Sequence, residues 1–168
     1  NAQISKEDVG PLFAHLGKEE FKEAHKVSSK LLKKFDKDTS YIMGIVRYAY
    51  LYSGAAQISS GEMDYADLKK KISRVEGRFI IMRGHPTTTD SAAIGSNINI
   101  LKKKDGKVNN YSVATNKNKT SIFFFEYYAF NEDFDIEKYN GKNTRCGGTL
   151  SSVEFNPNES TVWIMRLK

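Results

Sequence analysis

The feature that most constrains the fold is a change in the spacing of apolar residues near Val75. Before that point apolar residues recur at steps of three and four, and after it they alternate with polar residues between Gly, Asn and Asp turns. The first spacing is typical of helices with one buried face, and the second of strands. We therefore expect an α+β protein, with a helical region at 1–75 and an antiparallel β region at 76–168.

Three helices are predicted in the first region. Phe21, Ala24 and Phe35 mark the apolar stripe of a helix over about 18–36. The segment 41–58 is apolar almost all round, which predicts the buried helix of this region. A third helix over 61–73 ends in a lysine run, where the helix dipole favours positive charge. A short helix before these three is expected to begin at Pro11 and to end at Gly17.

About six strands are predicted in the second region, at 77–83, 97–103, 107–115, 119–130, 143–155 and 160–168. Asp105-Gly106 between two such runs predicts a hairpin. The turn residues at 156–159 predict a second hairpin that joins 150–155 to 161–167. These strands are expected to form either an antiparallel sheet or a small barrel.

The stretch at 119–130 is rich in aromatic residues on both of its faces, and only Glu126 interrupts it. A strand that is apolar on both faces is covered on both faces. One cover is then the interior of the sheet, and the other is the helical region. This predicts that the two regions form one compact unit rather than two domains joined by a linker.

Several kinds of chemistry are excluded by composition and spacing. The mean hydropathy is −0.54, and no apolar run approaches the ~18 residues of a transmembrane helix. One cysteine, Cys146, excludes an internal disulfide and a multi-cysteine zinc site. His15 and His25 are too far apart to share a metal on one helix, and no phosphate-binding glycine pattern occurs. We therefore predict no metal and no cofactor. Because Asn1 stands where Met is usual, we lean towards an exported protein.

Charge points to a candidate binding surface. The chain has a net charge of +6, and the segment 98–120 holds six lysines against one acid. This pattern fits a solvated loop or a basic surface that meets an anionic partner. The polar segment 84–91, predicted as a loop, follows a strand that ends in an arginine. The residues of this candidate surface are Lys102, Lys103, Lys104, Lys107, Arg83, His85 and Asp90.

Two partial resemblances to known families follow from particular segments. The helical residues 19–24 and 31–38, followed by a new helix that contains Gly44, resemble a tetratricopeptide-repeat hairpin over about 19–58. Such repeats bind peptides in a concave groove. The segments 76–84 and 140–148 each have a glycine, a basic residue, a strand and a second glycine seven residues after the first. This resembles a small OB-type barrel over about 76–168, and that family binds oligonucleotides or oligosaccharides.

The sequence favours a non-catalytic, soluble binding or accessory module that recognises a protein or peptide partner. One alternative is an OB-type binder of nucleic acid or oligosaccharide, which needs exposed aromatic rings beside the lysines. Another is a small hydrolase that uses His85 with Asp90. No nucleophile elbow accompanies these two residues, so no catalytic residue is assigned.

Overall fold

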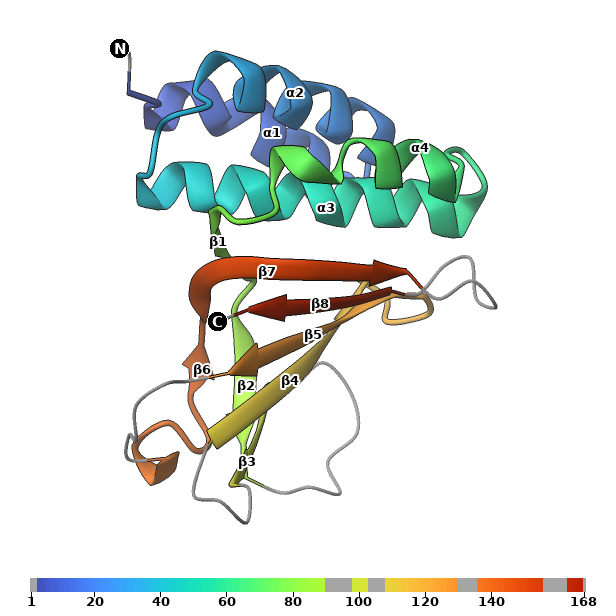
Figure 1. Cartoon of the computed structure of the whole chain (residues 1–168). Helices are drawn as coiled ribbons and strands as arrows, with labels where there is room; N and C mark the ends of the chain where they lie inside the picture. Colours follow the sequence, from blue (N-terminus) through green and yellow to red (C-terminus); the bar gives the residue numbers. More distant parts are fainter. Residues whose placement is uncertain (1–2, 90–97, 103–107, 130–135, 156–162, 168) are drawn as a thin grey trace.

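A computed structural model of the chain describes residues 3–89, 98–102, 108–129, 136–155 and 163–167. Its helices form a helical layer more than one helix deep, which lies on one side of a single curved sheet (Figure 1). The α+β class and the packing of an N-terminal helical region on a C-terminal sheet are therefore confirmed. The helices are α1 (Lys6–Gly17), α2 (Phe21–Lys34), α3 (Tyr41–Ser60) and α4 (Tyr65–Lys70), with short 3-10 turns at Ile72–Arg74 and Ile136–Lys138.

Helix α1 begins five residues before Pro11, the predicted start. The reason is a capping box, in which the Ser5 hydroxyl accepts from the Asp8 amide and the Asp8 carboxylate accepts from the Ser5 amide. These two bonds satisfy backbone donors that the first turn leaves open. Pro11 consequently lies inside the helix.

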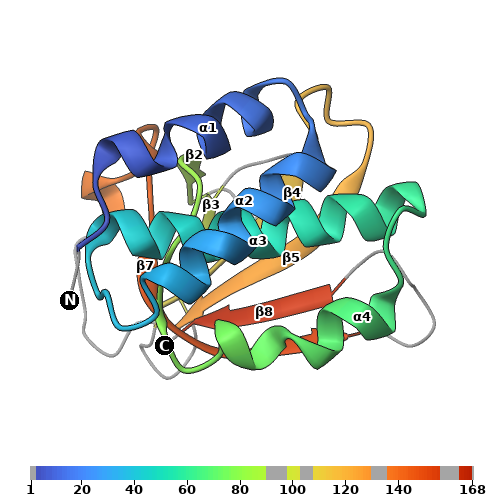
Figure 2. The same ribbon diagram turned by 90° about the horizontal axis from the view of Figure 1, so that it is seen from above.

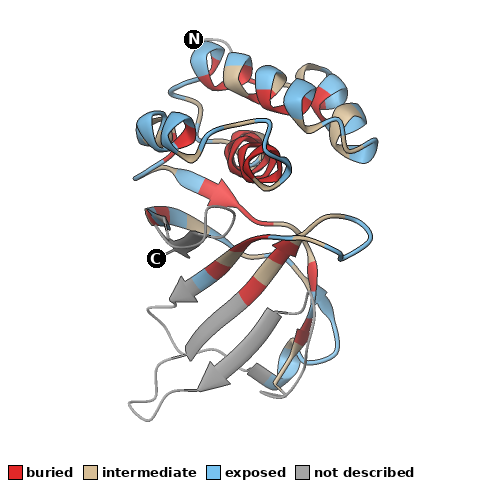
Figure 3. Cartoon of the chain, turned by 90° about the vertical axis from the view of Figure 1, so that its right-hand side faces the viewer, coloured by how far each residue is buried: buried red, intermediate tan, exposed pale blue. Residues whose placement is uncertain are grey.

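Helix α3 is the central element of the molecule, as its composition predicts. Every residue from Val46 to Ile58 is buried, because α1 and α2 cover one side of this helix and the sheet covers the other (Figure 3). Ser40 caps its first turn, and Gly61 ends it in a left-handed conformation with φ +80°. That conformation is one which residues with a side chain rarely adopt.

Eight strands make up the sheet. Its order is β1-β7-β8-β5-β4-β3-β2-β6, so of the two expected shapes the described strands form a sheet with two ends. Five of the described pairings are antiparallel, and two, β2 with β3 and β5 with β8, are parallel. Both predicted hairpins pair as expected, as β3–β4 and β7–β8. The strands are β1 (Phe79–Ile81), β2 (His85–Thr88), β3 (Ile98–Lys102), β4 (Val108–Thr115), β5 (Ile122–Ala129), β6 (Asn143–Thr144), β7 (Gly147–Phe155) and β8 (Trp163–Leu167).

The sheet curls strongly. Strands β1 and β2 stand far apart in the strand order, yet only residues 82–84 separate them along the chain. The same stretch of chain, 79–88, also pairs with 143–149, first as β1 with β7 and then as β2 with β6. The two ends of the sheet therefore lie close together, and described polar side chains of its strands, such as His85, Thr87 and Glu126, are buried.

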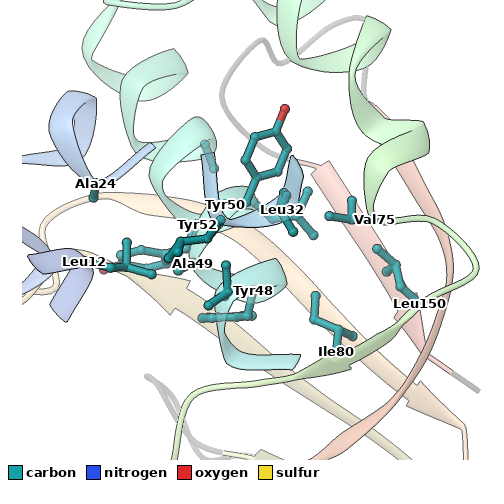
Figure 4. Packing of buried hydrophobic residues seen from close by; sticks show 14 of the residues in the cluster. Leu12, Ala24, Leu32, Tyr48, Ala49, Tyr50, Tyr52, Val75, Ile80 and Leu150 are labelled. Carbon is teal, nitrogen blue, oxygen red and sulfur yellow. The ribbon is translucent and has the colours of Figure 1, made fainter. Parts of the chain in front are cut away.

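The main core surrounds α3, between α1 and α2 on one side and the sheet on the other. Figure 4 shows side chains from the helices and the strands packed together, including Leu12 of α1, Leu32 of α2, Ile80 of β1 and Leu150 of β7. Arg47 also stands in this layer at only 2% exposure. Its guanidinium donates to the carbonyl oxygens of Phe79 (2.8 Å) and Asp38 (2.6 Å), and so links α3 to β1 and to the α2–α3 connection.

The aromatic strand β5 is covered less completely than predicted. Phe123 and Phe124 are buried and contact rings of the helical layer. Ile122 and Tyr127, in contrast, are 45% and 40% exposed. The prediction that both faces of this stretch are covered is therefore wrong at Ile122 and Tyr127. One physical reason is the irregularity in the β4–β5 register beside Phe123, which turns that ring towards the helices.

Candidate functional site

A groove opens where the helical layer meets the sheet. It has a volume of about 270 Å³ and is lined by the end of α1, one face of α3 and the chain that follows β1. Phe13, Leu16, Ile45 and Tyr52 give it apolar walls. Phe13 is 45% exposed, so the groove presents an aromatic ring that the protein itself leaves open to solvent.

Three cationic side chains also line this groove, against one acid, Glu19. Arg83 stands over the ring of Tyr52, with its guanidinium carbon 5.0 Å from the ring centre, and donates to the Tyr52 hydroxyl (3.1 Å). Arg145 and Lys117 are exposed. Within the described parts of the chain, none of the three cations forms an ion pair with a carboxylate.

Tyr52 fixes the back of the groove. Its hydroxyl donates to the carbonyl oxygen of Thr115 (2.7 Å), which also accepts from Arg83 (3.0 Å). Burial raises the pKa of the Tyr52 phenol, although the nearby Arg83 charge opposes the shift. The phenol therefore stays protonated and keeps its role as a donor to Thr115 at physiological pH.

A buried polar cluster lies behind the groove, and Tyr48 connects the two. The Tyr48 ring lines the groove, and its hydroxyl donates to Oε1 of Glu126 (2.7 Å). Ser112 donates to the other carboxylate oxygen (2.6 Å), and His85 Nε2 lies 3.7 Å from that same oxygen. Glu126 is fully buried, and His85 is 4% exposed. A buried carboxylate needs such partners because its desolvation is costly.

The lone cysteine is held as a thiol. Burial, and then the negative charge of Glu126, raise the pKa of Cys146 to about 11. Cys146 is partly buried and packs against the core.

Two of the predicted site residues, Arg83 and His85, lie at or near the groove, but in different surroundings. Arg83 lines the groove, whereas His85 is enclosed behind it with Glu126. The prediction of a loop over 84–91 is wrong for the first part of this segment, because His85–Thr88 form strand β2. The tertiary reason is pairing on both sides, with β3 and β6.

The side chains of the remaining predicted site residues lie outside the described part of the structure. Asp90, Lys103, Lys104 and Lys107 lie outside the described residues, so the suggested pairing of His85 with Asp90 stays a prediction. Lys102 is the last residue of β3, and only its backbone is described.

Sequence reasoning missed Phe13, Tyr48 and Arg145 as members of one site. These residues come from elements far apart in the chain, and no local pattern joins them. Glu126 did carry a signal, because a single charge within an aromatic strand requires buried partners. The sequence alone did not identify those partners as Tyr48, Ser112 and His85.

Comparison of the chain with models of protein families, with curated proteins and with solved structures finds no match in any of the three. The resemblances to a tetratricopeptide-repeat hairpin and to an OB-type barrel therefore stay predictions. The described helices include none with the length and apolar character to cross a membrane. Among the described side chains, no group of three or more His, Cys, Asp or Glu is placed to hold a metal ion.

Proposed function

We propose that this chain is a non-catalytic binding module that recognises a segment of a protein or peptide partner. The segment presents an apolar side chain next to an acidic group. The observation that carries this proposal is the groove at the junction of the two layers, where apolar walls meet three cations that lack carboxylate partners among the described residues.

The size of the groove favours a segment of a larger partner. Sites that enclose a drug-sized ligand have volumes of ~300–1,000 Å³. At about 270 Å³ this groove is smaller, with room for one or two side chains of a partner. The exposed ring of Phe13 supports the same view, because open aromatic rings are frequent anchors of protein interfaces.

The arrangement of the buried cluster supports a non-catalytic role. The Ser112 hydroxyl is fully buried and donates its proton to Glu126 instead of to a histidine base in an open cleft. His85 is likewise enclosed. The cluster thus serves to position Tyr48, which is a wall of the groove.

A nuclear magnetic resonance titration tests this proposal. The probe is a blocked glycine peptide that carries one leucine followed by one aspartate, and the control is the same peptide with asparagine. We expect the aspartate peptide to shift the backbone amide signals of Phe13, Leu16 and Ile45. Addition of salt should weaken binding, because salt screens the exposed cations.

Two variants of matched exposure locate the interaction. Phe13→Ala should weaken binding about tenfold, since it removes an aromatic contact area. Ile122→Ala should leave binding unchanged, because Ile122 is equally exposed, at 45%, but does not line the groove. The proposal is wrong if neither peptide binds, or if the shifted signals belong to residues away from the groove.

A further inference from the structure

The cations that line the groove come from other segments, but they lie beside different parts of α3. The distance between them limits how far apart the acidic groups of a partner can be. Ile45 and Tyr52 are the first and last α3 residues that line the groove. The helix rises about 1.5 Å per residue, so these seven steps correspond to a length of about 10 Å.

Arg145 marks one end of this length. Its guanidinium lies 3.4 Å from the hydroxyl of Tyr41, which is the first residue of α3 and stands one turn before Ile45. Tyr41 is 57% exposed and Arg145 is exposed as well, so the guanidinium at this end of the groove is accessible from solvent.

Lys117 marks the other end. Its ammonium group donates to the carbonyl oxygen of Gly17 at the end of α1. Lys117 also follows closely after Thr115, which accepts the hydrogen bond of Tyr52. Figure 2 shows the β4–β5 connection that carries Lys117 beside the α1–α2 connection, towards the end of the molecule opposite the start of α3. Arg83 stands at this same end, because it donates to the Tyr52 hydroxyl and to the Thr115 carbonyl oxygen.

We infer that the groove takes an extended segment in which an acidic residue stands two positions before an apolar residue and a second acidic residue two positions after it. In an extended chain such side chains point to one side, and the outer pair is about 13 Å apart at about 3.3 Å per residue. That distance slightly exceeds the apolar length of the groove. It therefore places one carboxylate near Arg145, the other near Lys117, and the apolar side chain against Tyr48 and Ala49, which lie midway along this length.

This inference rests on the proposed function and adds the spacing of the charges to it. Three blocked peptides in a glycine background test it by titration at low salt. The first has the order Asp-Gly-Leu-Gly-Asp, the second has Asn in place of the first Asp, and the third has both acids on the same side of the leucine. We expect the first to bind about threefold more tightly than either of the others, the size of one exposed ion pair.

Charge-removing variants assign the two ends. Arg145→Gln and Lys117→Gln should each weaken binding of the first peptide about threefold. Lys142→Gln is the matched control, because Lys142 is exposed but does not line the groove. In addition, one of the two groove variants should leave binding of the Asn peptide unchanged, because that peptide lacks the carboxylate that the removed cation would meet.

The outcomes separate the two proposals. If no peptide binds, the proposed function fails and the inference fails with it. If all three peptides bind in the groove with equal affinity, the proposed function stands and the inferred spacing is wrong. Equal effects of Arg145→Gln and Lys142→Gln on the first peptide would also overturn the inference.

Discussion

His25 makes the stability of this protein depend on pH in a way that follows from its surroundings. The imidazole is 8% exposed, stacks on Tyr50 at 4.4 Å between ring centres, and has Nδ1 3.0 Å from the Tyr50 carbonyl oxygen and 3.2 Å from the Ser53 hydroxyl. Burial lowers its pKa from 6.5 to about 4, and the charges of Lys71 and Arg74 act in the same direction. The hydrogen bond to Tyr50 opposes this shift.

The sign and size of the effect follow from linkage between protonation and folding. Because the folded pKa is the lower one, the unfolded chain binds a proton first as the pH falls. The contribution of His25 is therefore fully present above about pH 6.5 and is lost as the pH falls towards about 4. Between pH 7.5 and 5 the loss amounts to about 2 kcal/mol.

Urea unfolding followed by far-ultraviolet circular dichroism measures this loss. The comparison variant is His25→Asn, whose amide nitrogen can donate to the Tyr50 carbonyl oxygen without titrating. The difference in free energy of unfolding between pH 7.5 and 5 should be about 2 kcal/mol smaller in the variant than in the original chain. All other titrating groups are common to both proteins, so the comparison isolates His25.

A second measurement does not depend on the stability of the variant. Nuclear magnetic resonance of the imidazole protons should show His25 neutral at pH 5.5, where a histidine of ordinary pKa is about 90% protonated. An ordinary titration of His25 near pH 6.5 in the folded chain would refute the reasoning, and so would an identical pH dependence of stability in the two proteins.

Further substitutions test the packing and the electrostatics of the interior. Arg47→Met should destabilise the fold by about 3 kcal/mol in urea unfolding, because the carbonyl oxygens of Phe79 and Asp38 lose the charged donor that a buried side chain brings to them. A loss below about 1 kcal/mol would contradict this role. Gly44→Ala should destabilise the fold by about 1–2 kcal/mol, because its new methyl group would lie 2.9 Å from the side chain of Ile81. Gly10→Ala is the matched control in a helix: its methyl group would have nothing within 4 Å, so it should stabilise the fold by about 0.5–1 kcal/mol. Glu126→Gln should lower the pKa of Cys146 below about 11 by removing a nearby negative charge, as measured by thiol alkylation against pH; an unchanged value would leave burial as the only cause.

The helical layer was largely predictable because its apolar spacing is strong. The apolar run at 41–58 became α3, which extends only two residues further, to Ser60. The third predicted helix, 61–73, is shorter, as α4 followed by a 3-10 turn. Its core contribution is small, with Leu68 as the one buried residue of α4, and a weak apolar stripe fixes helix ends poorly.

Strand β2 shows why the polar part of the sheet was harder to predict. Its burial alternates along the strand, with His85 and Thr87 buried and Pro86 exposed. This alternation of buried and exposed residues is typical of a strand. In β2, however, the buried positions are occupied by the polar residues His85 and Thr87, which face the enclosed side of the curled sheet. A search for alternating apolar residues therefore does not detect it. Thr87 bonds to Thr144 across the β2–β6 pair, which shows how its hydroxyl is satisfied there.

Tyr48 links the enclosed polar side chains to the proposed binding surface. Its hydroxyl is held at 2.7 Å by Glu126, and its ring packs 5.9 Å from that of Tyr52, which is itself bound to Thr115 and Arg83. Two aromatic walls of the groove are thus fixed before any partner arrives. Ordering flexible side chains on association costs about 0.5–1.5 kcal/mol for each of them. A groove with walls already fixed avoids that cost, so the proposed binding of a short segment requires no ordering of Tyr48 or Tyr52, and under that proposal the costly burial of Glu126 has a use.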